Sequence, residues 1–161
     1  MFEDDVPLED RIYCGEQVKL LVLSRSLAGT YVPDLPYLVI SITDPHRQDA
    51  VLADSPLLGG ILRLRFNDTS HLDAPEIADC YVGNDILMCS QDAENILNFV
   101  KSRPPEIGLI ICHCEFGISR SAGIAAALSR LLNHDDEFFF ANYFPNIRAY
   151  NLLLDSAVAL T

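Results

Sequence analysis

The chain has 161 residues, of which 50% are hydrophobic and 21% are charged, a size and composition typical of one globular domain with a sizeable core. Eleven Lys and Arg residues against 23 Asp and Glu residues give a formal net charge of −12, which repels polyanions and argues against a nucleic-acid partner. We therefore expect any anionic ligand to be held by a concentrated local site.

The ends and the cysteines of the chain predict its compartment. Residues 3–5 are acidic, and the start of the chain lacks the basic and apolar regions of a secretory signal. No apolar run approaches the roughly 20 residues that span a bilayer. The five cysteines form an odd set in a chain large enough to fold without disulfides, which favours reduced thiols. We predict a cytoplasmic protein that does not bind membranes.

Four segments predict β-strands by their apolar runs or alternation. They cover residues 19–23, 37–42, 62–66 and 107–112. The third alternates, so that Arg63 and Arg65 fall on the face opposite its apolar residues. The fourth is apolar throughout, which is typical of a central strand covered on both sides.

Helical spacing of apolar residues predicts helices between and after these strands. The first lies around residues 93–100, with Ser90 or Asp92 as candidate caps and a stop at Pro104 and Pro105. The others cover residues 121–132, 138–140 and 146–159. This order predicts an α/β fold: one domain over residues 1–161, with a largely parallel central sheet flanked by helices. Residues 1–12 are expected to form a flexible acidic tail.

Residues 111–123, Ile-Cys-His-Cys-Glu-Phe-Gly-Ile-Ser-Arg-Ser-Ala-Gly, run from the most apolar strand into a helix, where open α/β sheets bind ligands. Unpaired N–H groups and the helix dipole make such a loop an anion cradle. Gly117 permits the required backbone angles, and Arg120 adds a two-pronged contact to a phosphate-type anion. The same positive field would stabilise a thiolate at Cys114, which makes Cys114 a candidate nucleophile. Ser121 or Ser119 could hydrogen-bond its sulfur.

The pattern His113-Cys114-x5-Arg120-Ser121, with Gly117 inside it, resembles the signature of the cysteine-dependent protein tyrosine phosphatase superfamily. The form HCxxGxxRS is the one usual in the compact dual-specificity branch. The resemblance implies a phosphate-binding loop between the central strand and a helix, and hydrolysis of phosphomonoesters through a phosphocysteine, without a metal or other cofactor. Phosphorylated proteins or small phosphate esters would be the substrates.

The resemblance also implies roles for individual residues. Cys114 would attack phosphorus, Ser121 would stabilise its sulfur, and His113 would orient the loop. The phosphate-binding residues that it implies are Glu115, Phe116, Gly117, Ile118, Ser119 and Arg120.

The family mechanism further needs an aspartic acid that protonates the leaving oxygen. Asn67-Asp68-Thr69 resembles the general-acid loop of dual-specificity phosphatases, which makes Asp68 the candidate. The 46 positions from Asp68 to Cys114 exceed the spacing usual in that branch, so we assign the excess to an insertion at residues 70–89. Asp73 is the reserve candidate.

Other functions stay open at this point. A phosphate-reading adaptor would keep the loop without turnover, and a sulfur transferase or arsenate reductase would use a similar cysteine loop. Cys112 is expected to be a small core residue, although a redox role beside Cys114 is conceivable. Cys112-His113-Cys114 is followed by no second pair at metal-ligand spacing, so we predict no metal site. The acidic Glu115 beside the loop disfavours a highly charged inositol substrate.

Overall fold

A computed structural model of the chain describes residues 6–69, 81–82 and 85–159. Within these residues, the main sheet has five strands in the order β1-β2-β7-β3-β4. Their bounds are Tyr13–Cys14 for β1, Lys19–Ser24 for β2, Tyr37–Thr43 for β3, Leu58–Arg65 for β4 and Leu109–Cys114 for β7. Among the described strands of this sheet, the edge strand β1 is antiparallel to β2, and the β2–β7, β7–β3 and β3–β4 pairs are parallel. The predicted α/β fold with a largely parallel sheet is confirmed.

Strand β7 lies at the centre, between β2 and β3, and all six of its residues are buried. Its side chains alternate between the two faces of the sheet, as a strand requires. Ile110, Cys112 and Cys114 belong to the larger core, whereas Leu109 and Ile111 belong to the smaller one. The continuous apolar character of this segment therefore reflects cover on both faces, as the sequence predicts.

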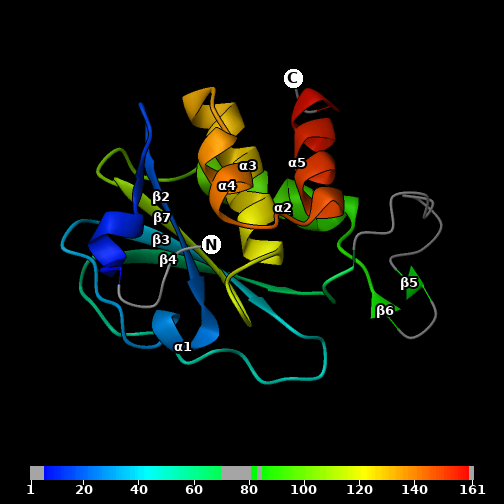
Figure 1. The fold of residues 1–161 in the computed structure, drawn as a ribbon, viewed down its shortest axis with the longest axis horizontal. Helices are drawn as coiled ribbons and strands as arrows, with labels where there is room; N and C mark the ends of the chain where they lie inside the picture. Colours follow the sequence, from blue (N-terminus) through cyan, green and yellow to red (C-terminus); the bar gives the residue numbers. More distant parts are fainter. Residues whose placement is uncertain (1–5, 70–80, 83–84, 160–161) are drawn as a thin grey trace.

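In the described part of the chain, four α-helices cover one face of the sheet, and one short α-helix lies at the other face (Figure 1). On the larger side are α2 (Ser90–Lys101), α3 (Arg120–Asn133), α4 (Glu137–Asn142) and α5 (Ile147–Ala159). On the smaller side is α1 (Arg25–Ala28). The cap of α2 is Cys89, not Ser90 or Asp92, although Asp92 completes the cap by accepting from the backbone N–H of Cys89 at 3.0 Å.

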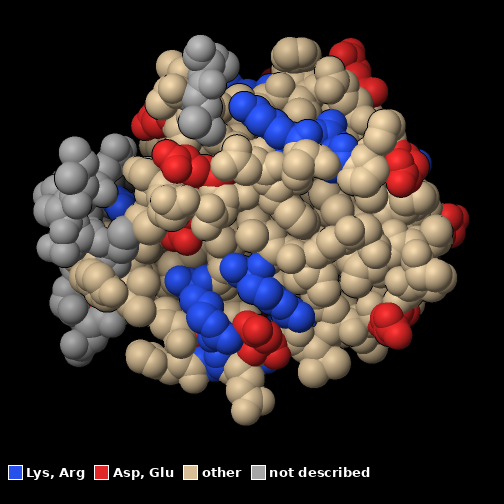
Figure 2. All heavy atoms as spheres, turned by 180° about the vertical axis from the view of Figure 1, so that it is seen from behind, with Lys and Arg blue, Asp and Glu red and all other residues tan. Residues whose placement is uncertain are grey.

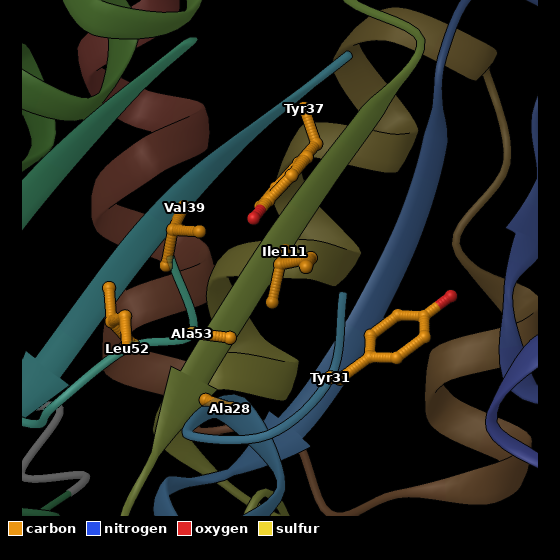
Figure 3. Close-up of a pocket in the computed structure, with 7 residues that line it drawn as sticks. All are labelled: Ala28, Tyr31, Tyr37, Val39, Leu52, Ala53 and Ile111. Atoms are coloured by element: carbon orange, nitrogen blue, oxygen red, sulfur yellow. The ribbon is translucent and has the colours of Figure 1, made fainter. Parts of the chain in front are cut away.

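The smaller core contains a small apolar cavity (Figure 3). The residues that line it are Ala28, Tyr31, Tyr37, Val39, Leu52, Ala53 and Ile111. Since none of these side chains is charged and Ile111 points away from the face that holds Cys114, this cavity is not a site for a phosphate group.

Parts of the expected tail, residues 1–12, and of the expected insertion, residues 70–89, lie within the described residues. Within residues 1–12, η1 (Leu8–Arg11) is a 3-10 helix, and Leu8 and Ile12 pack against the smaller core. Residues 1–5 lie outside the described residues. Of residues 70–89, β5 (Tyr81–Val82) pairs with β6 (Asp85–Ile86) in an antiparallel ladder. The assignment of this stretch as an insertion stays a prediction.

In the part of the chain that the structure describes, no helix is both long and apolar enough to cross a bilayer.

Candidate active site

The loop between β7 and α3 runs from Cys114 to Arg120 and closes tightly against β2. Gly117 has a φ of 68°, a left-handed conformation that glycine adopts without strain. A Cβ at this position would lie 2.6 Å from the carbonyl carbon of Leu23 and from the backbone nitrogen of Ser24. The glycine thus allows the loop to pack against the carboxyl end of strand β2. The loop then leads directly into the N-terminus of α3, a helix of 14 residues.

Cys114 lies at the base of this loop, with 3% of its surface exposed. Its Sγ is 3.0 Å from Oγ of Ser121, in the first turn of α3. Either the thiol or the hydroxyl can be the donor of this hydrogen bond. Cys112 is fully buried two residues earlier, and burial raises the pKa of its thiol. Cys112 therefore remains protonated in the core, whereas Cys114 has a polar partner.

His113 is a fully buried residue of strand β7. Its Nδ1 is 3.4 Å from the carbonyl oxygen of Cys114, and its Nε2 is 2.6 Å from Oγ of Ser41. A carbonyl only accepts, so Nδ1 carries the proton and Nε2 accepts from the Ser41 hydroxyl. The Oγ of Ser41 in turn accepts from Nη1 of Arg63 at 2.9 Å. Burial lowers the pKa of His113 to about 4, which keeps the ring neutral near pH 7.

Arg120 begins α3, and its side chain turns back under the loop with 4% of its surface exposed. Nη1 donates to Oδ1 of Asp44 at 2.7 Å and to the carbonyl oxygen of Phe66 at 2.8 Å. Nε is buried and has no hydrogen-bond partner among the described residues. Buried N–H groups are nearly always paired, and this nitrogen can donate a hydrogen bond to an acceptor that binds in the loop.

Glu115 is the acidic residue inside the loop, and two arginines neutralise it. Its side chain, 8% exposed, forms ion pairs with Arg25 at 3.2 Å and with Arg47. The backbone N–H of Arg25 also donates to the carbonyl oxygen of Glu115. The carboxylate therefore fastens the loop to α1 and to the segment after β3. In contrast, the neighbouring side chain of Phe116 is 80% exposed.

Asp68, the candidate general acid, lies beside the loop. Its Oδ1 accepts from Oγ of Ser119 at 2.8 Å and from Nδ2 of Asn146 at 2.9 Å. The reserve candidate Asp73 lies outside the described residues. The aspartate that follows β4 and the loop that follows β7 thus meet at the carboxyl edge of the sheet.

No protein-family model matches the chain, and no curated protein matches it. Solved structures do match. A human tyrosine phosphatase-like serine/threonine/tyrosine-interacting protein is 17% identical at a TM-score of 0.59, with 88% of this chain and 93% of that chain covered. A mouse putative dual specificity phosphatase is 14% identical at a TM-score of 0.60, with coverages of 99% and 93%. Human DUSP28 is 15% identical at a TM-score of 0.59, with coverages of 92% and 93%.

The chain has the dual-specificity phosphatase fold. This confirms the fold that the resemblance of residues 113–121 implied. At these identities the likeness is one of fold.

Some residues at this edge of the dual-specificity phosphatase fold have no signal in the sequence. Asp44 and Ser41 are ordinary polar residues at the end of a strand, and Arg25 follows a different strand. Asn146 had a weak signal, because an Asn after a Pro and before an apolar helical pattern is a typical N-cap. The parallel arrangement of β2, β3 and β7 brings Arg25, Ser41 and Asp44 to one edge of the sheet. The packing of the helices brings Asn146, at the α4–α5 junction, to the same edge.

Proposed function

We propose that the protein is a phosphomonoester hydrolase of the protein tyrosine or dual-specificity phosphatase type. The observation that carries this proposal is the buried Nε of Arg120, which has no hydrogen-bond partner within residues 6–69, 81–82 and 85–159. The same loop holds a buried cysteine 3.0 Å from a serine hydroxyl. A tetrahedral oxyanion bound in the loop would pair with this nitrogen and with the N–H groups ahead of α3.

The proposed reaction has two steps. In the first, the Cys114 thiolate attacks phosphorus, the P–S bond forms, and the bond to the ester oxygen breaks as Asp68 gives that oxygen its proton. In the second, Asp68 removes a proton from water, which attacks phosphorus and breaks the P–S bond. Ser121 stabilises the departing sulfur, and Arg120 holds the equatorial oxygens throughout. Water is consumed, and inorganic phosphate and an alcohol or phenol are released.

Two further observations support this function. The mouse dual specificity phosphatase of the same fold was crystallised with zinc tungstate, and tungstate has the tetrahedral shape and charge of phosphate. In the present chain, Arg25 and Arg47 neutralise Glu115, so this carboxylate does not repel a bound phosphate. The substrate is a phosphorylated protein or a small phosphate ester, and the free thiol of Cys114 suits the reducing cytoplasm.

The test is hydrolysis of p-nitrophenyl phosphate in the presence of EDTA. We expect wild-type activity that vanadate inhibits. Cys114→Ser should lower kcat by roughly a thousandfold or more, because serine is a poor nucleophile at neutral pH. The same variant should bind tungstate with nearly unchanged Kd, since the N–H cradle and Arg120 remain. Cys14→Ser, at an exposed free cysteine, is the matched control and should keep full activity.

Other outcomes would favour the other uses of such a loop. Tungstate binding by the wild type without turnover of any ester would indicate an adaptor, a use in keeping with the phosphatase-like interacting protein of the same fold. Release of thiocyanate from thiosulfate and cyanide, without phosphate release, would indicate a sulfur transferase. Reduction of arsenate, again without phosphate release, would indicate an arsenate reductase. Any of these results would overturn the hydrolase proposal.

A further inference from the structure

Asn146 lies at the junction of α4 and α5, 3% exposed, and contacts three separate parts of the site. Its backbone N–H donates to the carbonyl oxygen of Ser119 in the phosphate loop at 2.9 Å. Its side-chain Oδ1 accepts from the backbone N–H of Ala149 at 3.0 Å, as an N-cap of α5 does. Its Nδ2 donates to Oδ1 of Asp68 at 2.9 Å and to the carbonyl oxygen of Thr69 at 3.0 Å.

These partners determine the orientation of the amide. The oxygens of Asp68 and Thr69 accept from Nδ2, and the N–H of Ala149 can only donate, so a flipped amide would lose all three bonds. Both N–H groups of the side-chain amide therefore donate to the loop that holds Asp68. The other end of the amide is fixed by a 13-residue helix.

Asp68 needs such support. It lies on an exposed loop after β4, where a carboxyl group held only by its own backbone would sample several rotamers. Proton transfer to a leaving oxygen requires the carboxyl within hydrogen-bond reach of that oxygen, and small displacements cost rate. Asn146 and Ser119 both donate hydrogen bonds to the same oxygen of Asp68, Oδ1. We therefore assign the proton transfer to the other oxygen, Oδ2.

We propose that Asn146 is the positioning residue of the general acid: its amide, anchored by α5, holds the Asp68 carboxyl against the phosphate loop. This inference rests on the proposed function, because a carboxyl needs such placement only if Asp68 transfers a proton. It also assigns the α4–α5 junction a part in the reaction.

The test compares esters that need the acid with esters that do not. Phosphotyrosine has a poor leaving group, whereas the phenolate of p-nitrophenyl phosphate departs with little help. Asn146→Ser keeps a residue type that caps helices but is too short to reach Asp68. Asn146→Asp also keeps the cap and replaces both N–H donors with an acceptor. Asn142→Ser is the matched control, because Nδ2 of Asn142 donates to the carbonyl oxygen of Phe138 and not to the site.

We expect Asn146→Ser and Asn146→Asp to lower kcat on phosphotyrosine by tenfold or more and on p-nitrophenyl phosphate by a few-fold at most. The Kd for tungstate should stay within about twofold of the wild-type value. In the background of Asp68→Asn, a further Asn146→Ser change should have no additional effect on phosphotyrosine, because both substitutions remove the same function. The Asn142→Ser variant should match the wild type.

The opposite results overturn the inference. One such result is that the Asn146 variants lose the same fraction of kcat on both esters, and that the losses caused by Asn146→Ser and Asp68→Asn multiply in the double variant. That result would mean that Asn146 only supports the fold. If both Asn146 variants keep the wild-type kcat on both esters, Asn146 has no role in the reaction. If Asp68→Asn itself loses no more activity on phosphotyrosine than on p-nitrophenyl phosphate, Asp68 is not the acid and the inference fails while the hydrolase proposal stands. A wild type that hydrolyses neither ester would overturn both.

Discussion

At the scale of single residues, His113 connects the phosphate loop to the sheet through a directional chain of hydrogen bonds. Arg63 donates to Ser41, Ser41 donates to His113, and His113 donates to the carbonyl oxygen of Cys114. The chain requires a neutral imidazole, because a protonated Nε2 has no lone pair to accept the Ser41 proton. Burial lowers the pKa of His113 to about 4, and this keeps the imidazole in the neutral form that these hydrogen bonds require.

This lowered pKa predicts a pH dependence of stability. In the unfolded chain His113 takes up its proton near pH 6.5, whereas in the folded protein it does so only near pH 4. Between these values the unfolded state binds more protons, so the free energy of unfolding falls as the pH is lowered, by at most about 1.4 kcal/mol per unit. Urea unfolding of the wild type and of His113→Asn between pH 7.5 and 4.5 measures this.

The stability advantage of the wild type over His113→Asn should shrink as the pH falls through this window. The variant is the control for carboxylates that titrate in the same range, since it shares all of them. A difference in stability that stays constant with pH would contradict the neutral, buried imidazole.

At the scale of elements, α3 packs very closely against the segment that leads into α5. Gly123, in the first turns of α3, has the backbone of Asn146 directly against it, and a Cβ there would lie 2.5 Å from the carbonyl oxygen of Asn146. The backbone N–H of Asn146 already donates to Ser119 at the start of α3. Close approach of two backbones is a common reason for glycine inside a helix.

Gly123→Ala should therefore destabilise the protein, although the same change inside an exposed helix stabilises it by about 0.5–1 kcal/mol. We expect a loss of about 1–3 kcal/mol in the free energy of unfolding, as in other overpacked cores. Urea unfolding measures the change. Gly60→Ala serves as the control, because its Cβ would first meet the side chain of Phe99 at 3.3 Å rather than backbone. A more stable Gly123→Ala variant would refute the close contact.

At the scale of the whole molecule, charge is distributed unevenly. The chain carries a net charge of −12, yet basic side chains gather around acidic ones in the lower half of the face drawn in Figure 2. At the site itself, Arg25 and Arg47 outnumber the one carboxylate they pair with, Glu115, and Arg120 pairs with Asp44. Asp68 also lies against the loop. The three arginines are thus matched by three carboxylates among the described residues of the site, and the site lacks the large excess of negative charge of the whole chain.

Anion binding should therefore stabilise the entire domain, because the loop joins the central strand to α3. Tungstate at a hundred times its Kd should add about 2.7 kcal/mol to the free energy of unfolding, which for a chain of this length raises Tm by roughly 5–10 °C. Arg120→Lys should lose most of this increase, since lysine cannot make the two-pronged contact. Arg103→Lys, far from the loop in sequence and bonded to Val100, should keep it. Equal shifts in both variants would place the anion elsewhere.

The sequence alone determined the features that depend on neighbouring residues. Strands and helices followed from apolar periodicity, and the loop from Cys114 to Arg120 was recognisable because its residues are contiguous and its chemistry is local. The central place of β7 followed from the unbroken apolar run at residues 107–112, which includes most of this strand. The two-residue edge strand β1 and the start of β4 at Leu58 were not predicted, because a short pairing and a strand through Gly59 and Gly60 leave no apolar pattern.

The tertiary structure decided which distant residues complete the site. Asp44 and Arg120 are 76 positions apart, and Asp68 and Asn146 are 78 apart. Their types are common on any protein surface, and no local pattern marks them. They meet because parallel pairing sets the carboxyl ends of β3, β4 and β7 at one edge of the sheet, and because the helices on one face bring the α4–α5 junction to that same edge. Such contacts depend on the register of strands and the packing of helices, which arise only when the whole chain folds.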